Sequence, residues 1–137
     1  MTLLNNEIKD RISVRKDYGN FEDIECYPSK LNQVIMNLLT NSIQAIEGKG
    51  EIFIQTIGSA IGVKIIIKDN GKGMTPEVKE HIFEPFYTTK DVGKGTGLGL
   101  SISYGIIEQH NGNIDVISEP GKGTEFIISL PRTQSDQ

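Results

Sequence analysis

Asn37-Leu38-Leu39-Thr40-Asn41 places two carboxamides four residues apart in the middle of a helical pattern. On a helix such residues lie one above the other, one turn apart. Residues around them follow the three-four spacing of one buried face. The pattern predicts a long helix that opens at Pro28-Ser29, with Ser29 as N-cap, and ends at the glycines 48 and 50. The residues on this spacing are Leu31, Val34, Ile35, Leu38, Leu39, Ser42, Ile43 and Ile46.

A later run, Gly93-Lys94-Gly95-Thr96-Gly97-Leu98-Gly99-Leu100, has glycine at every other position and leads into a second helical pattern, 98–110. Glycines let backbone N–H groups approach phosphates closely, and a helix N-terminus favours an anion. The spacing excludes a dinucleotide fingerprint, and a P-loop is excluded because every Gly-Lys pair is followed by glycine rather than Ser or Thr. The run therefore predicts a loop that covers phosphates.

Between these segments, Asp69-Asn70-Gly71-Lys72-Gly73-Met74 follows an apolar strand pattern. A carboxylate walled by apolar residues can accept a hydrogen bond from the exocyclic amine of adenine, whereas guanine presents an acceptor at that position. The same residues are also compatible with an ordinary Asp-Asn-Gly turn. Taken together, the three segments predict an ATP-binding domain.

The remaining patterns define an α+β fold, a two-layer sandwich with a mixed sheet of about five strands backed by about three helices. The segment 63–68 is rich in β-branched residues and predicts a central strand covered on both faces. We expect 1–25 to add a helix and the first strand, 26–131 to form the core, and 132–137 to be a disordered tail. The expected strands are 11–18, 51–56, 63–68, 113–118 and 125–130, with short helices at 2–10 and 76–82, a long loop at 83–97 and a hairpin at 119–123.

Composition sets limits on function. The chain has 137 residues, of which 36% are hydrophobic and 23% charged, values typical of one globular domain. Its net charge of −4 argues against a nucleic-acid surface. We expect no membrane contact by this chain, because its apolar runs are too short to span a bilayer and the N-terminus lacks a signal-peptide pattern. The single Cys26 favours a cytoplasmic setting.

Five motifs in order resemble the catalytic ATP-binding domain of bacterial sensor histidine kinases. These domains belong to the GHKL superfamily (Bergerat fold), with gyrase B, the large heat-shock chaperone and mismatch-repair ATPases. The resemblance covers about residues 26–131. The matching segments are an asparagine box at 32–46, glycine boxes at 69–74, 95–100 and 121–126, and a phenylalanine box at 83–90.

The resemblance implies a role for each matching position. Asn41 is implied as the Mg²⁺ ligand with Asn37 assisting at the phosphates, and Asp69 as the adenine acceptor with Gly73 and Thr124. Segment 83–97 would be the ATP lid, from which a lysine meets the β- or γ-phosphate. The implied catalytic residues are Asn37, Asn41 and Lys90. The residues expected to bind ATP are Asn37, Asn41, Gln44, Asp69, Gly71, Gly73, Met74, Lys90, Lys94, Gly95, Thr96, Gly97, Leu98, Gly99, Leu100 and Thr124.

Two departures from the family pattern are visible. Many members carry a basic residue and an aromatic three and four positions after the metal asparagine, where this chain has Gln44 and Ala45. The phosphoacceptor motif, a histidine followed directly by an acidic residue, has no counterpart. We therefore expect structural roles for His81 and His110, and an acceptor histidine on a separate dimerisation domain absent from this chain.

Position 37 distinguishes the branches of the superfamily. ATPases and stand-alone anti-sigma serine kinases carry a glutamate there as general base, whereas Asn37 cannot take up a proton. A neutral histidine acceptor needs no such base. The sequence thus predicts a histidine kinase catalytic domain that requires Mg²⁺ and ATP and reaches a response regulator only indirectly. We expect a monomer, free in the cytoplasm or as the cytoplasmic part of a membrane-bound sensor. The alternatives are an anti-sigma-type serine kinase and a non-catalytic nucleotide-sensing module.

Overall fold

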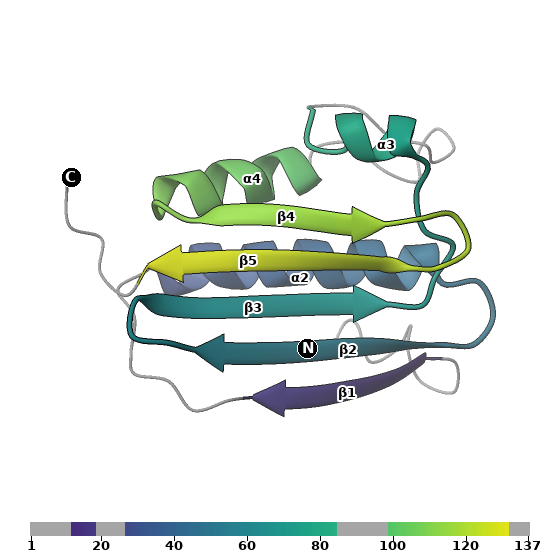
Figure 1. The fold of residues 1–137 in the computed structure, drawn as a ribbon, viewed down its shortest axis with the longest axis horizontal. Coiled ribbons are helices and arrows are strands. Elements are labelled where there is room, and N and C mark those ends of the chain that lie inside the picture. The colour runs from purple at the N-terminus through teal and green to yellow at the C-terminus, as the bar shows by residue number, and fades with distance from the viewer. Residues whose placement is uncertain (1–11, 19–26, 85–98, 132–137) are drawn as a thin grey trace.

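One five-stranded sheet with helices packed on one face makes up the fold (Figure 1). A computed structural model of the chain describes residues 12–18, 27–84 and 99–131. The predicted α+β sandwich is confirmed, with five strands and three helices in these ranges. The expected helix at 2–10, most of the lid and the tail at 132–137 lie outside them. The elements are β1 (Ile12–Tyr18), α2 (Pro28–Ala45), β2 (Gly50–Gly58), β3 (Gly62–Asp69), α3 (Pro76–His81), α4 (Gly99–Gln109), β4 (Asn113–Ser118) and β5 (Thr124–Pro131).

The sheet is mixed, with strand order β1-β2-β3-β5-β4. β1 runs parallel to β2, and the other three neighbouring pairs are antiparallel. The predicted central position of β3 is confirmed, because it lies between β2 and β5. The prediction that β3 is covered on both faces is wrong: Lys64 and Lys68, which alternate with the buried Val63 and Ile67, are exposed. The helices of the described ranges therefore lie on one face of the sheet.

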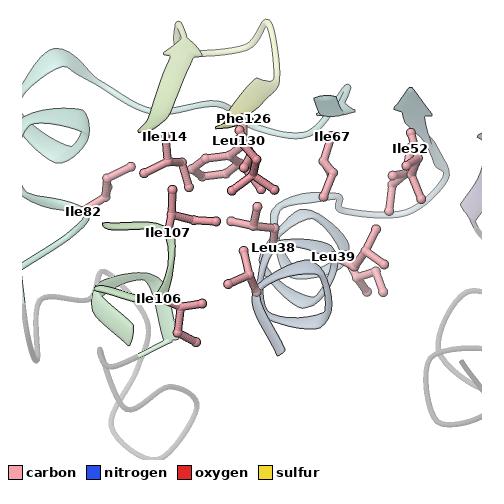
Figure 2. Packing of buried hydrophobic residues seen from close by; sticks show 14 of the residues in the cluster. Leu38, Leu39, Ile52, Ile67, Ile82, Ile106, Ile107, Ile114, Phe126 and Leu130 are labelled. Carbon is pink, nitrogen blue, oxygen red and sulfur yellow. The ribbon is translucent and has the colours of Figure 1, made fainter. Parts of the chain in front are cut away.

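The core lies between that face and helices α2 and α4 (Figure 2). Leu38 of α2 and Ile107 of α4 are fully buried, and both approach Phe126 of β5, which is also fully buried. Burying a side chain of this size stabilises the fold by roughly 1.5–3 kcal/mol. No helix in the described ranges is both long and apolar enough to cross a membrane.

The ends of α2 differ from the sequence prediction. The helix begins at Pro28 with Tyr27 as an N-cap that makes no side-chain cap bond, so the assignment of Ser29 as N-cap is wrong. Proline is favoured at the first helical position because its φ is already helical and no N–H is lost there. The helix ends at Ala45, before the predicted glycines, and the Lys72 N–H donates to the Ala45 carbonyl at 2.9 Å. The segment after β3 therefore caps this helix.

Helix α4 ends as the sequence predicts, at an Asn-Gly pair. Asn111 has a φ of 58°, and the Asn111 and Gly112 N–H groups donate to the carbonyls of Glu108 and Ile107, which is a Schellman motif. The preceding His110 is buried, and its Nδ1 lies 2.8 Å from the carbonyl of Ile106. Since a carbonyl only accepts, Nδ1 carries the proton and Nε2 accepts from the Tyr27 N–H at 3.1 Å. His110 thus joins the end of α4 to the start of α2, a structural role.

Candidate nucleotide-binding site

Three buried polar residues form a row across one end of the sheet. Asp69 ends β3 and is paired with Thr124 at the start of β5, which is paired in turn with Ser118 at the end of β4. Their exposed fractions are 2%, 4% and 5%. Each continues the alternation of its strand, so all three side chains lie on the face that carries the helices. The strand ends therefore place a polar patch beside the apolar core.

Asp69 presents a buried oxygen that the described protein leaves without a partner. Its Oδ1 accepts from the Gly71 N–H at 2.8 Å, whereas Oδ2 has no hydrogen bond, and neither has the buried Oγ of Ser42 on α2. Burial raises the pKa of Asp69, against the opposing effects of the Gly71 amide, the nearby Ser42 hydroxyl and the Thr124 amide. A buried unsatisfied acceptor is rare in a native protein. Such an atom is suited to a donor on a ligand.

The glycines at 73 and 123 let the two turns behind this row approach each other. Both have positive φ, 72° and 80°. A Cβ on Gly73 would lie 1.9 Å from the Glu119 carbonyl oxygen, and one on Gly123 would lie 2.0 Å from that of Asp69. A hydrogen bond of 2.7 Å from the Gly121 N–H to the Lys72 carbonyl joins the same turns. The first and last glycine boxes are thus in direct backbone contact.

Asn37 links α2 to the start of α4. Its Nδ2 donates to the Gly99 carbonyl at 3.1 Å and lies 3.2 Å from the Oγ of Ser103, which itself donates to Gly99 at 2.9 Å. Asn41, one turn along α2, is half-buried, and its side chain makes no hydrogen bond to the described residues. The amide-bearing helix therefore lies against the helix that follows the glycine run.

The other predicted site residues divide into two groups. Gly71, Gly73, Met74 and Thr124 lie in or beside the turns around Asp69, and the half-buried Leu100 lies in the first turn of α4. Gln44 is exposed on α2. The lid positions fall outside the described residues; they are Lys90, Lys94, Gly95, Thr96, Gly97 and Leu98.

The structure adds three polar residues that sequence reasoning missed. Ser42 lies near the Asp69 carboxylate, the Ser118 hydroxyl lies 2.9 Å from the hydroxyl of Thr124, and Asn70 accepts from the Glu51 N–H through its Oδ1 at 2.8 Å. The sequence does indicate that Ser118 is buried, because it continues the alternation of Ile114 and Val116 in β4. The apolar pattern predicts that Ser42 lies on the buried face of its helix but gives it no role in the site.

A surface hollow of about 650 Å³ lies between α3, α4 and β4. Its lining includes Lys79, Phe83, Tyr104 and Asp115. It contains none of the residues that the sequence predicts to bind nucleotide. The Asp69 end of the sheet, where the predicted residues do gather, therefore stays the candidate nucleotide site.

Comparison with known proteins identifies the family of this chain. The family of histidine kinase-, DNA gyrase B- and HSP90-like ATPases matches residues 26–134. This chain belongs to that family. The ATPase domain is 33% identical to the catalytic domain of the histidine kinase ThkA, solved without nucleotide, with a TM-score of 0.84 over 96% of this chain and 88% of that one. The predicted family and fold are confirmed.

Two curated relatives are sensor or sporulation kinases. Sensor histidine kinase ZraS of Escherichia coli K12 is 45% identical over 109 residues, which cover 80% of this chain and 23% of ZraS. Sporulation kinase E of Bacillus subtilis 168 is 49% identical over 114 residues, which cover 82% of this chain and 15% of that kinase. The ATPase domain therefore spans less than a quarter of either relative.

The contact between the turns predicts unequal effects at two glycines. Gly121 has a φ of 78° but nothing within 4 Å of an added Cβ, whereas Gly73 combines positive φ with the Glu119 carbonyl. We expect Gly121→Ala to cost about 1–2 kcal/mol of unfolding free energy and Gly73→Ala about 2–5 kcal/mol. Urea unfolding of both variants measures the difference. Equal losses would contradict the close approach of the two turns.

The buried carboxylate predicts a variant that is more stable than the wild type. Because burial raises the pKa of Asp69, the native state holds this proton at a higher pH than the unfolded chain does. Stability therefore falls as pH rises from the ordinary aspartate pKa through the raised one. Asp69→Asn removes the charge, keeps an oxygen for the Gly71 N–H and turns an N–H₂ toward the unsatisfied Ser42 hydroxyl.

We expect Asp69→Asn to unfold at a higher urea concentration than the wild type at pH 7.5, and the gap to shrink as pH is lowered through that window. Asp17→Asn, at an exposed position on β1, is the matched control and should change little. A less stable Asp69→Asn at pH 7.5 would contradict the assignment of a costly buried charge.

Proposed function

We propose that this ATPase domain binds Mg-ATP at the Asp69 end of the sheet and transfers the γ-phosphate to a histidine on a separate dimerisation domain. The observation that carries the proposal is the pairing of an unsatisfied buried carboxylate, Asp69, with an amide rather than a carboxylate at position 37. The buried carboxylate of Asp69 supports recognition of the adenine base. The amide at position 37 supports histidine as the phosphate acceptor.

Adenine is the base that suits this pocket. The free Oδ2 of Asp69 is an acceptor, and adenine offers a donor in its exocyclic amine where guanine and hypoxanthine offer a carbonyl. Gly73, held close to Glu119, brings backbone rather than a side chain into the turn beside Asp69. Met74 and Leu100 supply half-buried apolar surface.

The donor set on α2 fits Mg²⁺ bound together with a nucleotide. Within the described ranges, no group of three or more His, Cys, Asp and Glu could hold a metal ion alone. Asn41 offers an amide oxygen, a ligand that Mg²⁺ accepts when phosphate oxygens and water complete its octahedron. When bound, the ion neutralises charge on the phosphates. Asn41 is therefore the proposed ligand and Asn37 its neighbour at the phosphates.

The acceptor follows from the chemistry at Asn37. Its Nδ2 is committed to Gly99 and Ser103, and an amide cannot take a proton from water or serine. A neutral imidazole needs no base, so histidine is the acceptor that such a site can serve. Neither histidine of this chain fits that role. His110 is buried with both nitrogens bonded, and the carboxylate of Glu84, hydrogen-bonded to His81, raises the pKa of that imidazole.

The lid and the partners complete the proposal. Lys90 or Lys94 meets the β- or γ-phosphate, and the glycines and Thr96 of the run 93–100 cover the triphosphate. The phosphoryl group then passes from the dimerisation domain to a response regulator, so this domain contacts the regulator only indirectly. In isolation the domain is a monomer that acts in the cytoplasm.

Phosphotransfer to a separate domain tests the proposal. The isolated chain is incubated with radiolabelled Mg-ATP, alone and with a dimerisation domain from a sensor kinase. We expect negligible hydrolysis alone and acid-labile label on the histidine of the added domain. Acid-stable phosphoserine on an acceptor would support the serine kinase instead. Tight ATP binding without transfer to any histidine domain tried would support the nucleotide-sensing module.

The metal assignment predicts a selective effect at Asn41. Calorimetric titration with a non-hydrolysable ATP analogue, with and without Mg²⁺, separates metal-dependent from metal-independent affinity. We expect Asn41→Ala to lose most of the affinity gain from Mg²⁺ and to retain the metal-free affinity within about twofold, since one ligand group is removed. Asn32→Ala, at an exposed asparagine near the start of α2 that is not among the expected ATP-binding residues, is the matched control. An unchanged Mg²⁺ effect in Asn41→Ala would reject this ligand.

A further inference from the structure

Ser118 is a buried serine whose hydroxyl contacts three groups at the end of the sheet. The Met74 N–H donates to its Oγ at 2.9 Å, and the Oγ donates to the Gly123 carbonyl at 2.9 Å. The Oγ1 of Thr124 also lies 2.9 Å away. The hydroxyl thus connects the first glycine turn, the last glycine turn and the residue paired with Asp69.

The direction of the Ser118–Thr124 hydrogen bond follows from counting protons. A serine hydroxyl has one proton and two lone pairs. One lone pair of Ser118 is used by the Met74 N–H, and its proton goes to the Gly123 carbonyl, which can only accept. The remaining lone pair can bond to Thr124 only if the Thr124 hydroxyl donates its own proton. Thr124 is therefore the donor in this contact.

This direction fixes what Thr124 can offer to a ligand. Its proton is committed to Ser118, so its Oγ1 has only lone pairs left. The paired residue Asp69 adds Oδ2, which has no hydrogen-bond partner among the described residues and also only accepts when ionised. The side chains of these two paired residues therefore present acceptors alone. An amine donates to such a pair, whereas a carbonyl of a 6-oxo purine finds no donor there.

We propose that Ser118 is a positioning residue that acts through Thr124 to make the pocket select purines with a 6-amino group over 6-oxo purines. The inference rests on the proposed function, because it requires the base of the nucleotide to lie at the Asp69 end of the sheet. Without the Ser118 hydroxyl, the Thr124 hydroxyl can turn and donate. The pocket then tolerates an oxygen on the base.

The ratio of the Kd for ITP to the Kd for ATP tests this role. The two nucleotides differ at position 6 of the purine and at N1, and both are titrated in the presence of Mg²⁺. We expect Ser118→Ala to lower the ratio about three- to tenfold, the value of one hydrogen bond. Ser129→Ala, which removes a serine hydroxyl further along β5, is the matched control and should leave the ratio unchanged. A purely structural role for Ser118 would weaken both nucleotides equally, and an unchanged ratio overturns the proposal.

A double-mutant cycle shows whether the effect passes through Thr124. In a Thr124→Val background there is no hydroxyl to orient, so Ser118→Ala should change the ratio by less than about twofold. A full effect in that background overturns the proposal. Ser118→Cys, a weaker hydrogen-bonding group of similar size, serves if Ser118→Ala does not fold. A wild-type domain that binds neither nucleotide overturns the proposed function as well, whereas a variant that keeps the wild-type preference overturns only the role of Ser118.

Discussion

The burial of one ionisable carboxylate, that of Asp69, constrains most of this domain. A buried charge with an unsatisfied oxygen costs free energy in the unliganded protein, about 1–3 kcal/mol for the missing hydrogen bond alone. The chain keeps this group in place by making it the last residue of the central strand, paired with Thr124 and held by the Gly71 N–H. Stability of this kind is commonly given up where a ligand must be bound. The strand end is thus suited to a donor that the described residues do not supply.

The backbone around this carboxylate is built for close approach. Gly73 and Gly123 lie where a Cβ would come within about 2 Å of a carbonyl oxygen, so any other residue would push the two turns apart. Their approach also places the Ser118 hydroxyl between them, where it bonds to both turns. Two short glycine-rich segments, about fifty residues apart in the sequence, therefore lie side by side next to Asp69. Neither segment alone would hold Asp69 in a fixed position.

Much of the fold could be predicted because the apolar periodicity is strong. The spacing around Leu38 and the alternation around Ile52 and Phe126 identify which face of each element is buried, and the structure buries those residues. The N-cap of α2 was not predictable from the capping residue, because Pro28 takes the first helical position and the cap is Tyr27. The end of α2 depends on Lys72, which is distant in sequence. The sequence pattern around the end of α2 cannot predict a contact with a residue so far away in the chain.

The sequence predicts some features of the candidate site, both at the Asp69 end and at the Asn37–Asn41 end, but not others. Asp69 stands out because a charge follows an apolar strand, but the role of Ser118 depends on a register between β4 and β5 that sequence does not state. Asn37 and Asn41 stand out by spacing, yet the hydrogen bonds of Asn37 to Gly99 and Ser103 needed the packing of α2 on α4. The sequence therefore indicates which residues belong to the candidate site. It does not indicate the direction of their hydrogen bonds or the contacts between different helices and strands.

Helix α2 connects the two ends of the candidate site, so one rigid helix contacts both of them. Its last carbonyl, that of Ala45, accepts from the Lys72 N–H in the turn after Asp69. Two turns earlier, about 12 Å along the axis, Asn37 donates to Gly99 at the start of α4. The helix is fixed between these points by Leu38 and other fully buried residues. Any displacement of α4 relative to α2 must therefore break or move the Asn37 bonds, while the turn at Asp69 stays attached to the opposite end of the same helix.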